Sequence, residues 1–374
     1  MGRSILPKKI LVRISMIWQQ GFLPTSINLI NQACFLPLMR RYVLLIVIIL
    51  LGFSYYQDLD FSGMTGSIVA SESYVQDQGS IQVYFCPREG CETAFTNFIS
   101  TAEESVHCAL FDIGLPSVQE VLLSKERQGL DVKVVTDNDY IHKFTYDFVR
   151  EDSWGLMHDK FCIIDGKKIS TGSMNPTNNG VDKNNNNLLL IDSKTLAQNY
   201  DAEFQEMWDG DFKKGEPVQN PSVKLDGVKI ENYFCPEDHC AAHIKEELQK
   251  AETSIHLLTF SFTNDGIGDM ILLKHRDGIL IRGVMEARQV TDDSEYDRII
   301  YQDMDVLKDG NPNNMHHKVF IIDGKTVITG SMNPTGSGDE RNDENILIIH
   351  DEKIAQRFLQ EFEYVYKEAE GKQN

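Results

Sequence analysis

The segment MHDKFCIIDGKKISTGSMNPT at residues 157–177 decides the fold, and it returns as MHHKVFIIDGKTVITGSMNPT at residues 315–335. In both copies an apolar run, an Asp-Gly pair and a second β-rich run predict a strand, a two-residue turn and a second strand. Residues two apart on a strand share a face, so the histidine and the lysine of each copy point together. These pairs are His158 with Lys160 and His316 with Lys318.

An imidazole beside an ammonium group indicates an anion site rather than a metal site. The fixed positive charge opposes a cation at that distance. Each copy then ends its return strand with Gly-Ser-x-Asn, which adds hydroxyl and amide donors suited to phosphate oxygens. These four donors are Ser173, Asn175, Ser331 and Asn333.

The repetition of the polar residues points to chemistry rather than packing. A single His-x-Lys strand is explained by a half-buried histidine and a solvated lysine. A repeated fold needs only its apolar spacing to recur, yet here the polar residues also recur, at one offset of 158 residues (316 − 158). The motif aspartates, Asp165 and Asp323, stand at the Asp-Gly turns and are expected to fix the geometry of the motif rather than to carry protons.

This double His-x-Lys-x4-Asp motif, with its Gly-Ser-x-Asn, resembles that of the phospholipase D superfamily. More narrowly, residues 81–370 are similar to two fused copies of the short bacterial Nuc-type endonuclease domain, whose active site forms where two domains meet. The resemblance implies phosphodiester hydrolysis without metal or cofactor, in which one histidine attacks phosphorus and the other protonates the leaving oxygen. It also implies that the equatorial oxygens are stabilised by Lys160, Lys318, Asn175 and Asn333.

The length and pattern of the chain predict two similar halves. The 374 residues are 41% hydrophobic and 25% charged, which is ordinary for globular protein. Strands alternate with helical patterns in each half, so we expect an α/β sandwich in each, related by a pseudo-twofold axis. The expected repeats are residues 81–210 and 228–370, with a proline-containing linker at 211–227. Because one chain holds both half-sites, it is expected to be a monomer.

The N-terminal part differs in charge from the rest. Residues 1–57 contain six basic residues and no acid, so the other 30 basic and 56 acidic residues give the remainder a net charge of −26. Such an acidic body argues against a broad duplex-coating surface but leaves room for a local basic cleft. Residues 1–41 are interpreted as a basic tail, or as an extension if translation begins at Met39.

The run YVLLIVIILLGFSYY at residues 42–56 carries no charge, although it is shorter than the ~20 residues that span a bilayer comfortably. We interpret it as an uncleaved membrane anchor, with a signal-peptide core and a buried helix as the alternatives. Basic residues before it and acids after it predict a catalytic body outside the cytoplasm. Residues 57–80 are Ser/Gly-rich and are expected to be a flexible tether.

Four of the seven cysteines form two Cys-x4-Cys pairs that recur at an offset of 149 residues (235 − 86): Cys86 with Cys91 and Cys235 with Cys240. Repeat two therefore has nine extra residues before its catalytic strand (158 − 149). Outside the cytoplasm, two local disulfides are the leading interpretation. One zinc ion shared by four thiolates, and free thiols, are the alternatives. Cys108 and Cys162 lie in apolar runs and are expected to be buried thiols.

Three further histidines lie in or beside apolar strands. His107 and His256 recur at the offset of the cysteine pairs and begin apolar strands, so they are expected to be hydrogen-bonded core residues, with a substrate-facing role as the alternative. His317 points to the strand face opposite His316, and its counterpart in repeat one is Asp159.

The two repeats differ chemically 28 residues beyond each motif histidine, where repeat two has Glu344 and repeat one has Asn186. In the Nuc-type family this position is a glutamate that contacts the motif histidine. We therefore expect Glu344 to contact His316 and to raise its pKa, making His316 the general acid and His158 the nucleophile. In the alternative interpretation Asn186 is simply tolerated and either histidine attacks.

The sequence supports two substrate classes. Compact repeats without long loops favour a nuclease, which is the leading prediction. The anchor and the acidic body favour a phospholipase D that removes phospholipid head groups. A catalytically inert, membrane-tethered scaffold is disfavoured, because neither copy of the motif has lost a residue.

Overall fold

The computed structural model describes residues 74–373, and these fall within one compact unit. The predicted anchor at 42–56, the basic tail and most of the predicted tether lie outside the described residues. Among the helices that are described, none has the length and apolar character needed to cross a membrane.

Repeat one is built on a seven-stranded sheet with the order β2-β8-β7-β6-β3-β4-β5. Its strands are β2 (Ser80–Cys86), β3 (Ser105–Leu110), β4 (Asp131–Thr136), β5 (Val149–Glu151), β6 (Lys160–Ile164), β7 (Lys168–Gly172) and β8 (Asn186–Asp192). Its helical segments are α2 (Cys91–Ser100), α3 (Pro116–Arg127), η2 (Ile141–Lys143), α4 (Asn178–Asp182) and α5 (Lys194–Asp209).

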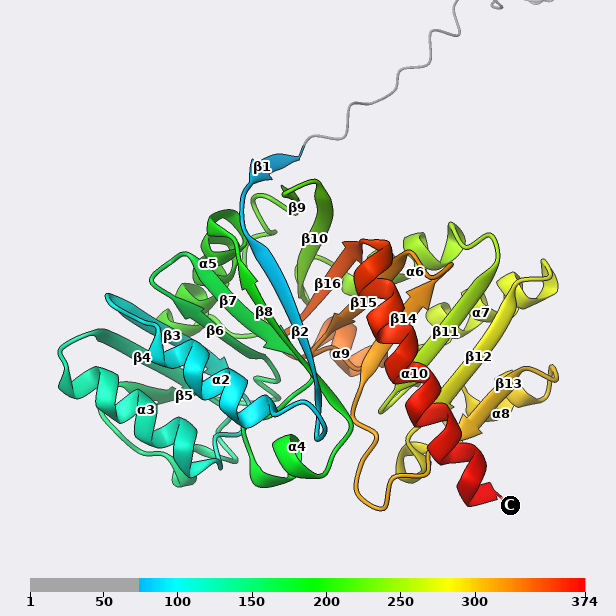
Figure 1. Cartoon of the computed structure of the whole chain (residues 1–374), viewed down its shortest axis with the longest axis horizontal. Coiled ribbons are helices and arrows are strands. Elements are labelled where there is room, and N and C mark those ends of the chain that lie inside the picture. The colour runs from blue at the N-terminus through cyan, green and yellow to red at the C-terminus, as the bar shows by residue number, and fades with distance from the viewer. Residues whose placement is uncertain (1–73, 374) are drawn as a thin grey trace, which may run out of the picture. The chain divides into compact units, whose positions relative to one another are not determined.

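Repeat two has the same strand order, β10-β16-β15-β14-β11-β12-β13, and lies beside repeat one (Figure 1). Its strands are β10 (Val228–Cys235), β11 (Ser254–Thr259), β12 (Leu280–Met285), β13 (Asp305–Lys308), β14 (Lys318–Ile322), β15 (Thr326–Gly330) and β16 (Glu344–His350). Its helical segments are α6 (Cys240–Gln249), α7 (Asp265–Arg276), η3 (Ala287–Gln289), α8 (Tyr296–Ile300), α9 (Gly336–Glu340) and α10 (Glu352–Gln373). The equal strand orders confirm a mixed α/β fold of two repeats.

Two short strands correct the predicted connecting segments. β1 (Val75–Asp77) lies within the expected tether and β9 (Ser222–Leu225) within the expected linker. They pair in parallel, and β9 pairs with β10, so the second sheet has nine strands. The chain just before repeat one is therefore attached to the sheet of repeat two.

The strand, turn and strand predicted for each motif are confirmed. β6 and β14 are buried along their whole length, as their KFCII and KVFII sequences lead one to expect. Asp165 and Asp323 each have φ 54°, and the glycine after each is also left-handed, which is the backbone of the tight hairpin turn favoured by Asp-Gly. The hairpins lead into β7 and β15, which carry the chain back toward the motif histidines.

The core has one central part and two outer parts. The central cluster is shared, since it combines Phe161 and Tyr200 of repeat one with Phe234, Val319 and Phe358 of repeat two. The outer clusters contain residues of α2 and α3 in repeat one, and of α6 and α7 in repeat two. Figure 1 shows α10 running across the sheet of repeat two. Because the central cluster draws on both sheets, the two repeats are packed as one body around their interface.

The nine extra residues of repeat two lie in one place. The offset of 149 still relates β4 to β12, whereas the offset of 158 relates β6 to β14 (280 − 131 and 318 − 160). The insertion therefore falls after β12, in the segment that contains α8.

Three disulfides brace the described residues. Cys86–Cys91 and Cys235–Cys240 confirm the predicted local bridges, and because their sulfurs are bonded to each other they cannot form the four-thiolate zinc site. The prediction for Cys108 and Cys162 was wrong: they form a third disulfide across β3 and β6. The two residues are opposite each other in the antiparallel register, with Cα atoms 4.0 Å apart.

Candidate active site

The two motif histidines are brought together by contacts that cross between the repeats. The amide of His158 donates to the carbonyl of Asp343 at 2.9 Å, and the amide of His316 donates to the carbonyl of Asn185, also at 2.9 Å. The residue before each histidine forms an isolated bridge with the opposite repeat. Each repeat therefore positions the other repeat's histidine, as the predicted shared cleft requires.

Two acids that the sequence reasoning missed hold the same segments from within each repeat. Asp137, directly after β4, accepts the amide of Met157 at 3.2 Å, and Glu286, directly after β12, accepts the amide of Met315 at 2.8 Å. These acids recur at the offset of 149 (286 − 137), which is the signal that could have identified them.

The four basic side chains are nearly enclosed. His158 and His316 are 6% and 8% exposed, and Lys160 and Lys318 are each 3% exposed. Each lysine donates to the carbonyl of the histidine two residues before it. Burial lowers the pKa of Lys160 to about 8 and lowers that of Lys318 well below its usual value. This concentration of positive charge suits a phosphate anion, which would favour the charged lysines.

An aromatic ring lies beside each His-Lys pair, another feature that the sequence reasoning missed. Phe111 is edge-to-face with His158 at 4.9 Å between ring centroids, and Phe260 with His316 at 4.6 Å. The ammonium groups of Lys160 and Lys318 lie 5.1 and 4.7 Å from the same two centroids. The phenylalanines also recur at the offset of 149 (260 − 111). They place an apolar ring beside each motif histidine and lysine.

The expected contact between Glu344 and His316 is corrected by the structure. Glu344 Oε2 lies 2.8 Å from Nδ1 of His158, the histidine of the other repeat. Asn186 Oδ1 lies 2.9 Å from Nδ1 of His316. The crossing arises because β8 and β16 begin at the repeat interface, where each first side chain meets the opposite motif.

The hydrogen bonds around His316 fix its neutral tautomer. Its Nδ1 faces two oxygens, Asn186 Oδ1 at 2.9 Å and the carbonyl of Ser173 at 3.2 Å. The amide of Asn186 is itself oriented, because its Nδ2 donates to the Gly180 carbonyl and its Oδ1 accepts the Ser173 hydroxyl. Nδ1 of His316 must therefore carry the proton. Burial and the nearby lysines hold the pKa of His316 well below its usual value, so the neutral ring has a free electron pair on Nε2.

Glu344, the partner of His158, gives this histidine the opposite protonation at Nε2. Burial raises the pKa of Glu344 to about 8, and burial with the two lysines holds the pKa of His158 well below its usual value. Near pH 7 the Glu344–His158 pair thus retains two protons. One proton lies in the hydrogen bond between Glu344 Oε2 and Nδ1 of His158. The other proton is therefore on Nε2 of His158. The pair presents an N–H donor where His316 presents a lone pair.

The four predicted phosphate-binding donors divide into two kinds. Ser173 and Ser331 are buried and are used internally, each accepting an amide from the following strand. Asn175 and Asn333 are partly exposed, and their Oδ1 atoms are buried without a hydrogen-bond partner. The asparagines remain the candidates for substrate contact, whereas the serines support the loop.

Asp165 and Asp323 are not part of this site. They follow the far ends of β6 and β14, whereas the lysines begin those strands. Asp165 accepts the amides of Glu103, Glu104 and Ser105. Although burial alone raises its pKa, these bonds bring the pKa below the usual value, and Asp323 behaves in the same way. The expectation that they fix geometry agrees with these contacts.

The surroundings of the other three histidines named above differ. His107 bonds Asp201 at 2.7 Å, in agreement with a core role, whereas Nδ1 of the buried His256 has no partner. His317 is fully buried between Asn187 and Glu361, with 3.1 Å to each. Its counterpart Asp159 accepts from Asn345.

The segments before the two motif histidines differ in polarity. In repeat one, Trp154 is 61% exposed and Leu156 is 36% exposed. The matching positions in repeat two are Pro312 and Asn314 (154 + 158 and 156 + 158). There Arg288 donates to the Pro312 carbonyl and to the Asn314 side chain. The segment before His158 thus exposes two large apolar side chains, whereas the segment before His316 is polar.

Comparison with known proteins shows which family the chain resembles. A family model described as "Cardiolipin synthase, PLD-like domain" matches residues 95–208 and 244–366. A phospholipase D of Rickettsia conorii is 32% identical over 138 residues, which are 37% of this chain and 69% of that protein. A mitochondrial cardiolipin hydrolase of Xenopus tropicalis is 31% identical over 136 residues, 33% of this chain and 65% of that protein.

The fold of both repeats together also has a counterpart. The phosphatidylserine synthase of Haemophilus influenzae matches with a TM-score of 0.58 over 77% of this chain and 86% of that structure, at 12% identity. The family model covers both repeats and more than half of the residues. The chain therefore belongs to the phospholipase D superfamily of phosphodiesterases, with one PLD-like domain in each repeat.

Proposed function

We propose that the protein hydrolyses a phosphodiester without metal, with His316 as the nucleophile and His158 as the general acid. The observation that carries this proposal is the crossed pairing of Glu344 with His158 and of Asn186 with His316. The free electron pair on Nε2 of His316 attacks phosphorus and forms a P–N bond. Nε2–H of His158 protonates the leaving oxygen as its bond to phosphorus breaks.

The second half of the reaction reverses these proton transfers. His158, now without its Nε2 proton, takes a proton from water, whose oxygen attacks phosphorus and releases His316. Lys160, Lys318 and the amides of Asn175 and Asn333 stabilise the equatorial oxygens in both halves. This assignment reverses the roles expected from the sequence, because Glu344 contacts the histidine of the other repeat.

Phospholipid is the substrate class that these observations favour. The segment before His158 exposes the apolar Trp154 and Leu156, whereas the segment before His316 is polar at Asn314, and such a difference suits a molecule with an apolar part and a polar head group. The net charge of −26 beyond residue 57 opposes a nucleic acid, which binds through many phosphates. The names of the relatives, phospholipase D and cardiolipin hydrolase, agree with this choice. The nuclease expected from the sequence stays a prediction and is the competing outcome.

The purified body, residues 58–374, should release head-group alcohol from phosphatidylcholine vesicles in EDTA. His158→Ala and His316→Ala should each lower kcat by about 10³ or more. Glu340→Gln is the control, because it changes an exposed residue outside the motifs and should retain its kcat. Single-stranded DNA, RNA and duplex DNA are assayed alongside. Hydrolysis of a nucleic acid with no release from lipid would replace the phospholipid proposal, and a requirement for added divalent metal would overturn the mechanism.

The assignment of the two histidines has a separate test. When turnover is quenched without acid, mass spectrometry should locate the phosphatidyl group, bound through its phosphorus, on His316. The His158→Ala variant lacks the acid of the first step and the base of the second, so the adduct that it does form should be hydrolysed more slowly than that of the wild type. An adduct on His158 would reverse the assignment while leaving the metal-independent mechanism intact.

We further propose that residues 42–56 anchor the protein with its catalytic body outside the cytoplasm. The support is the three disulfides, which persist in oxidising compartments, together with the basic segment before the anchor. Protease added to intact cells should degrade the body, and its protection would contradict this topology.

A further inference from the structure

A lysine in the linker between the repeats, Lys213, is buried between acids from both. Its Nζ lies 2.5 Å from Oδ2 of Asp152 in repeat one and 3.5 Å from Oδ2 of Asp343 in repeat two, and all three side chains are at most 3% exposed. Burial raises the pKa of Asp343 to about 8, although the amide and the charge of Lys213 act against this rise. Near pH 7 the charge of Lys213 is therefore matched mainly by Asp152. A buried ion pair adds little net stability by itself, so the location of this one is more informative than its energy.

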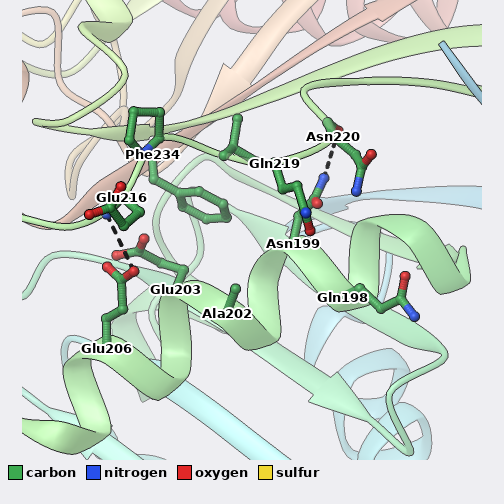
Figure 2. A pocket seen from close by; sticks show the side chains of 11 residues that line it. Gln198, Asn199, Ala202, Glu203, Glu206, Glu216, Gln219, Asn220 and Phe234 are labelled. Carbon is green, nitrogen blue, oxygen red and sulfur yellow. Dashed lines mark hydrogen bonds between the residues drawn. The ribbon is translucent and has the colours of Figure 1, made fainter.

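The linker around Lys213 is held in place by repeat one. The amide of Glu216 donates to Glu206 of α5 at 3.3 Å, and the carbonyl of Asn220 accepts from Asn199 of the same helix at 2.8 Å (Figure 2). Lys213 itself has φ 57°, a left-handed conformation that is unfavourable for a residue with a side chain. Such a backbone persists only where its surroundings impose it, and it is found most often at functional sites.

The first acid that Lys213 contacts supports the backbone of the proposed general acid. The amide of Lys213 donates to Oδ1 of Asp343. The carbonyl of Asp343 accepts the amide of His158 at 2.9 Å, and its amide donates to the carbonyl of Leu156 at 3.1 Å. The next residue is Glu344, whose carboxyl group bonds Nδ1 of His158. A shift of Asp343 would therefore move both members of the Glu344–His158 pair.

The second acid begins the segment that leads to His158. Asp152 directly follows β5, and the chain then passes over the side chain of Lys213. Gly155, with φ 75°, makes this close approach possible, because a Cβ there would lie 3.0 Å from Cε of Lys213. The ammonium group also lies 5.5 Å from the ring centroid of Trp154. Lys213 thus holds residues 152–157 from below, at one end of the catalytic strand.

Repeat two supports its histidine with neutral amides instead. The residue equivalent to Asp343 is Asn185 (343 − 158), and its carbonyl accepts the amide of His316. Oδ1 of Asn185 accepts from Nδ2 of Asn311 at 2.6 Å. The linker passes once between the repeats, so its lysine serves one histidine only. The ionic support coincides with the histidine that is proposed to donate a proton.

We propose that Lys213 is a positioning residue, which holds the Glu344–His158 pair where it can protonate the leaving oxygen. This role rests on the proposed function, in which His158 is the general acid. Lys213 is too deeply enclosed by Asp152 and Asp343 to bind substrate as well. Its effect on the reaction is therefore indirect, through the position of His158, and a displacement of about 1 Å at a reacting group can lower a rate by about 10².

The test compares two lipids that differ only in the leaving group, phosphatidylcholine and phosphatidyl-p-nitrophenol, with full-length protein in EDTA. Choline must be protonated as it leaves, whereas p-nitrophenolate leaves as a stable anion and does not need the acid. The readout is kcat/KM, which includes only the steps up to departure of the leaving group. Lys213→Met should lower kcat/KM for phosphatidylcholine by about 10–10², and that for phosphatidyl-p-nitrophenol by less than about threefold.

The neighbouring residue provides the matched control. Lys214 pairs with Asp211 at the surface and its side chain is 69% exposed, so Lys214→Met should leave both values of kcat/KM unchanged. The double variant Asp152→Asn/Lys213→Met removes both charges of the buried pair, which covers a failure of Lys213→Met to fold. It should show the same selective loss. In hydrogen exchange, the amides of residues 156–158 should exchange faster in this variant than in the wild type, and those of residues 314–316 should not.

The outcomes separate this role from the proposed function. An equal loss on the two lipids, or no loss on either, in a folded Lys213 variant overturns the role of Lys213 and leaves the hydrolysis itself intact. Wild-type protein that releases neither choline nor p-nitrophenol contradicts the hydrolysis of phospholipid. If nucleic acid is cleaved instead, a dinucleotide and a nucleoside p-nitrophenyl phosphodiester form the equivalent pair, and the same selective loss is expected.

Discussion

At the residue scale, the structure differs most from the sequence-based expectation at Glu344. The sequence identified Glu344 and Asn186 as the chemical difference between the repeats, but it placed Glu344 beside His316. The contact in fact joins Glu344 to His158 at 2.8 Å. Spacing within a repeat predicts which side chains share a strand face, whereas a partner across the interface depends on how the two repeats dock. The motif residues were therefore predictable and their pairing was not.

Glu344 should control the alkaline side of the pH dependence. Burial raises its pKa to about 8, so the Glu344–His158 pair holds the acid proton below that pH and loses it above. The kcat of the wild type should thus fall as pH rises through about 8. Glu344→Gln cannot hold that proton, so kcat at pH 7 should drop by about 10²–10⁴ and the fall near pH 8 should disappear.

The measurement is kcat at saturating substrate from pH 5 to about 10. Lys160 also has its pKa lowered to about 8, but bound phosphate favours its charged form, so kcat isolates the Glu344–His158 pair better than kcat/KM does. Glu340→Gln removes the same charge from an exposed position and serves as the control. An unchanged alkaline limb in Glu344→Gln would show that another group donates the proton.

At the scale of elements, the third disulfide shows what strand prediction leaves out. The sequence correctly placed Cys108 and Cys162 in apolar strands, and a buried thiol was a reasonable expectation for each. Their bond depends on β3 and β6 being neighbours in a register that sets these two residues opposite each other. Neighbouring strands far apart in the sequence are a tertiary property, so the periodicity of either strand could not reveal it.

Removing the strand-to-strand disulfide should cost more stability than removing a local one. Cys108–Cys162 closes a loop with a sequence separation of 54, whereas Cys86–Cys91 closes one of 5. On the chain-entropy estimate, the double alanine variants lose about 4 and about 2 kcal/mol of unfolding free energy, respectively. Urea denaturation of both variants and of wild type measures the difference. Equal losses would contradict this ranking, and free thiols at Cys108 and Cys162 in unreduced protein would contradict the bond itself.

At the scale of the whole molecule, two repeats of the same topology enclose one asymmetric site. The shared core and the crossed hydrogen bonds make the catalytic unit the pair of repeats rather than either one. Duplication within one chain allows the halves to diverge, as the carboxylate and amide behind the two histidines have done. The segments before the two motif histidines have diverged as well, since one exposes apolar side chains and the other is polar.

The overall charge leads to a prediction that separates the substrate classes. Beyond residue 57 the chain carries a net charge of −26, so an anionic surface should repel it at low ionic strength. Head-group release from zwitterionic vesicles should change little between about 0.05 and 0.5 M NaCl. Release from vesicles that contain anionic lipid should start lower and rise with salt, because screening shortens the repulsion to about 10 Å at 0.1 M.

A nuclease with a basic track would behave in the opposite way, since binding to many phosphates weakens as salt increases. The decisive measurement is therefore the salt dependence of kcat/KM on zwitterionic vesicles, anionic vesicles and single-stranded DNA, for one preparation of the protein. Cleavage of DNA that falls steeply with salt would show that a local basic surface outweighs the charge of −26, and it would favour the nuclease. A rise with salt on anionic vesicles, with zwitterionic vesicles unaffected, would support a phospholipid hydrolase whose body is held off anionic membranes by its own charge.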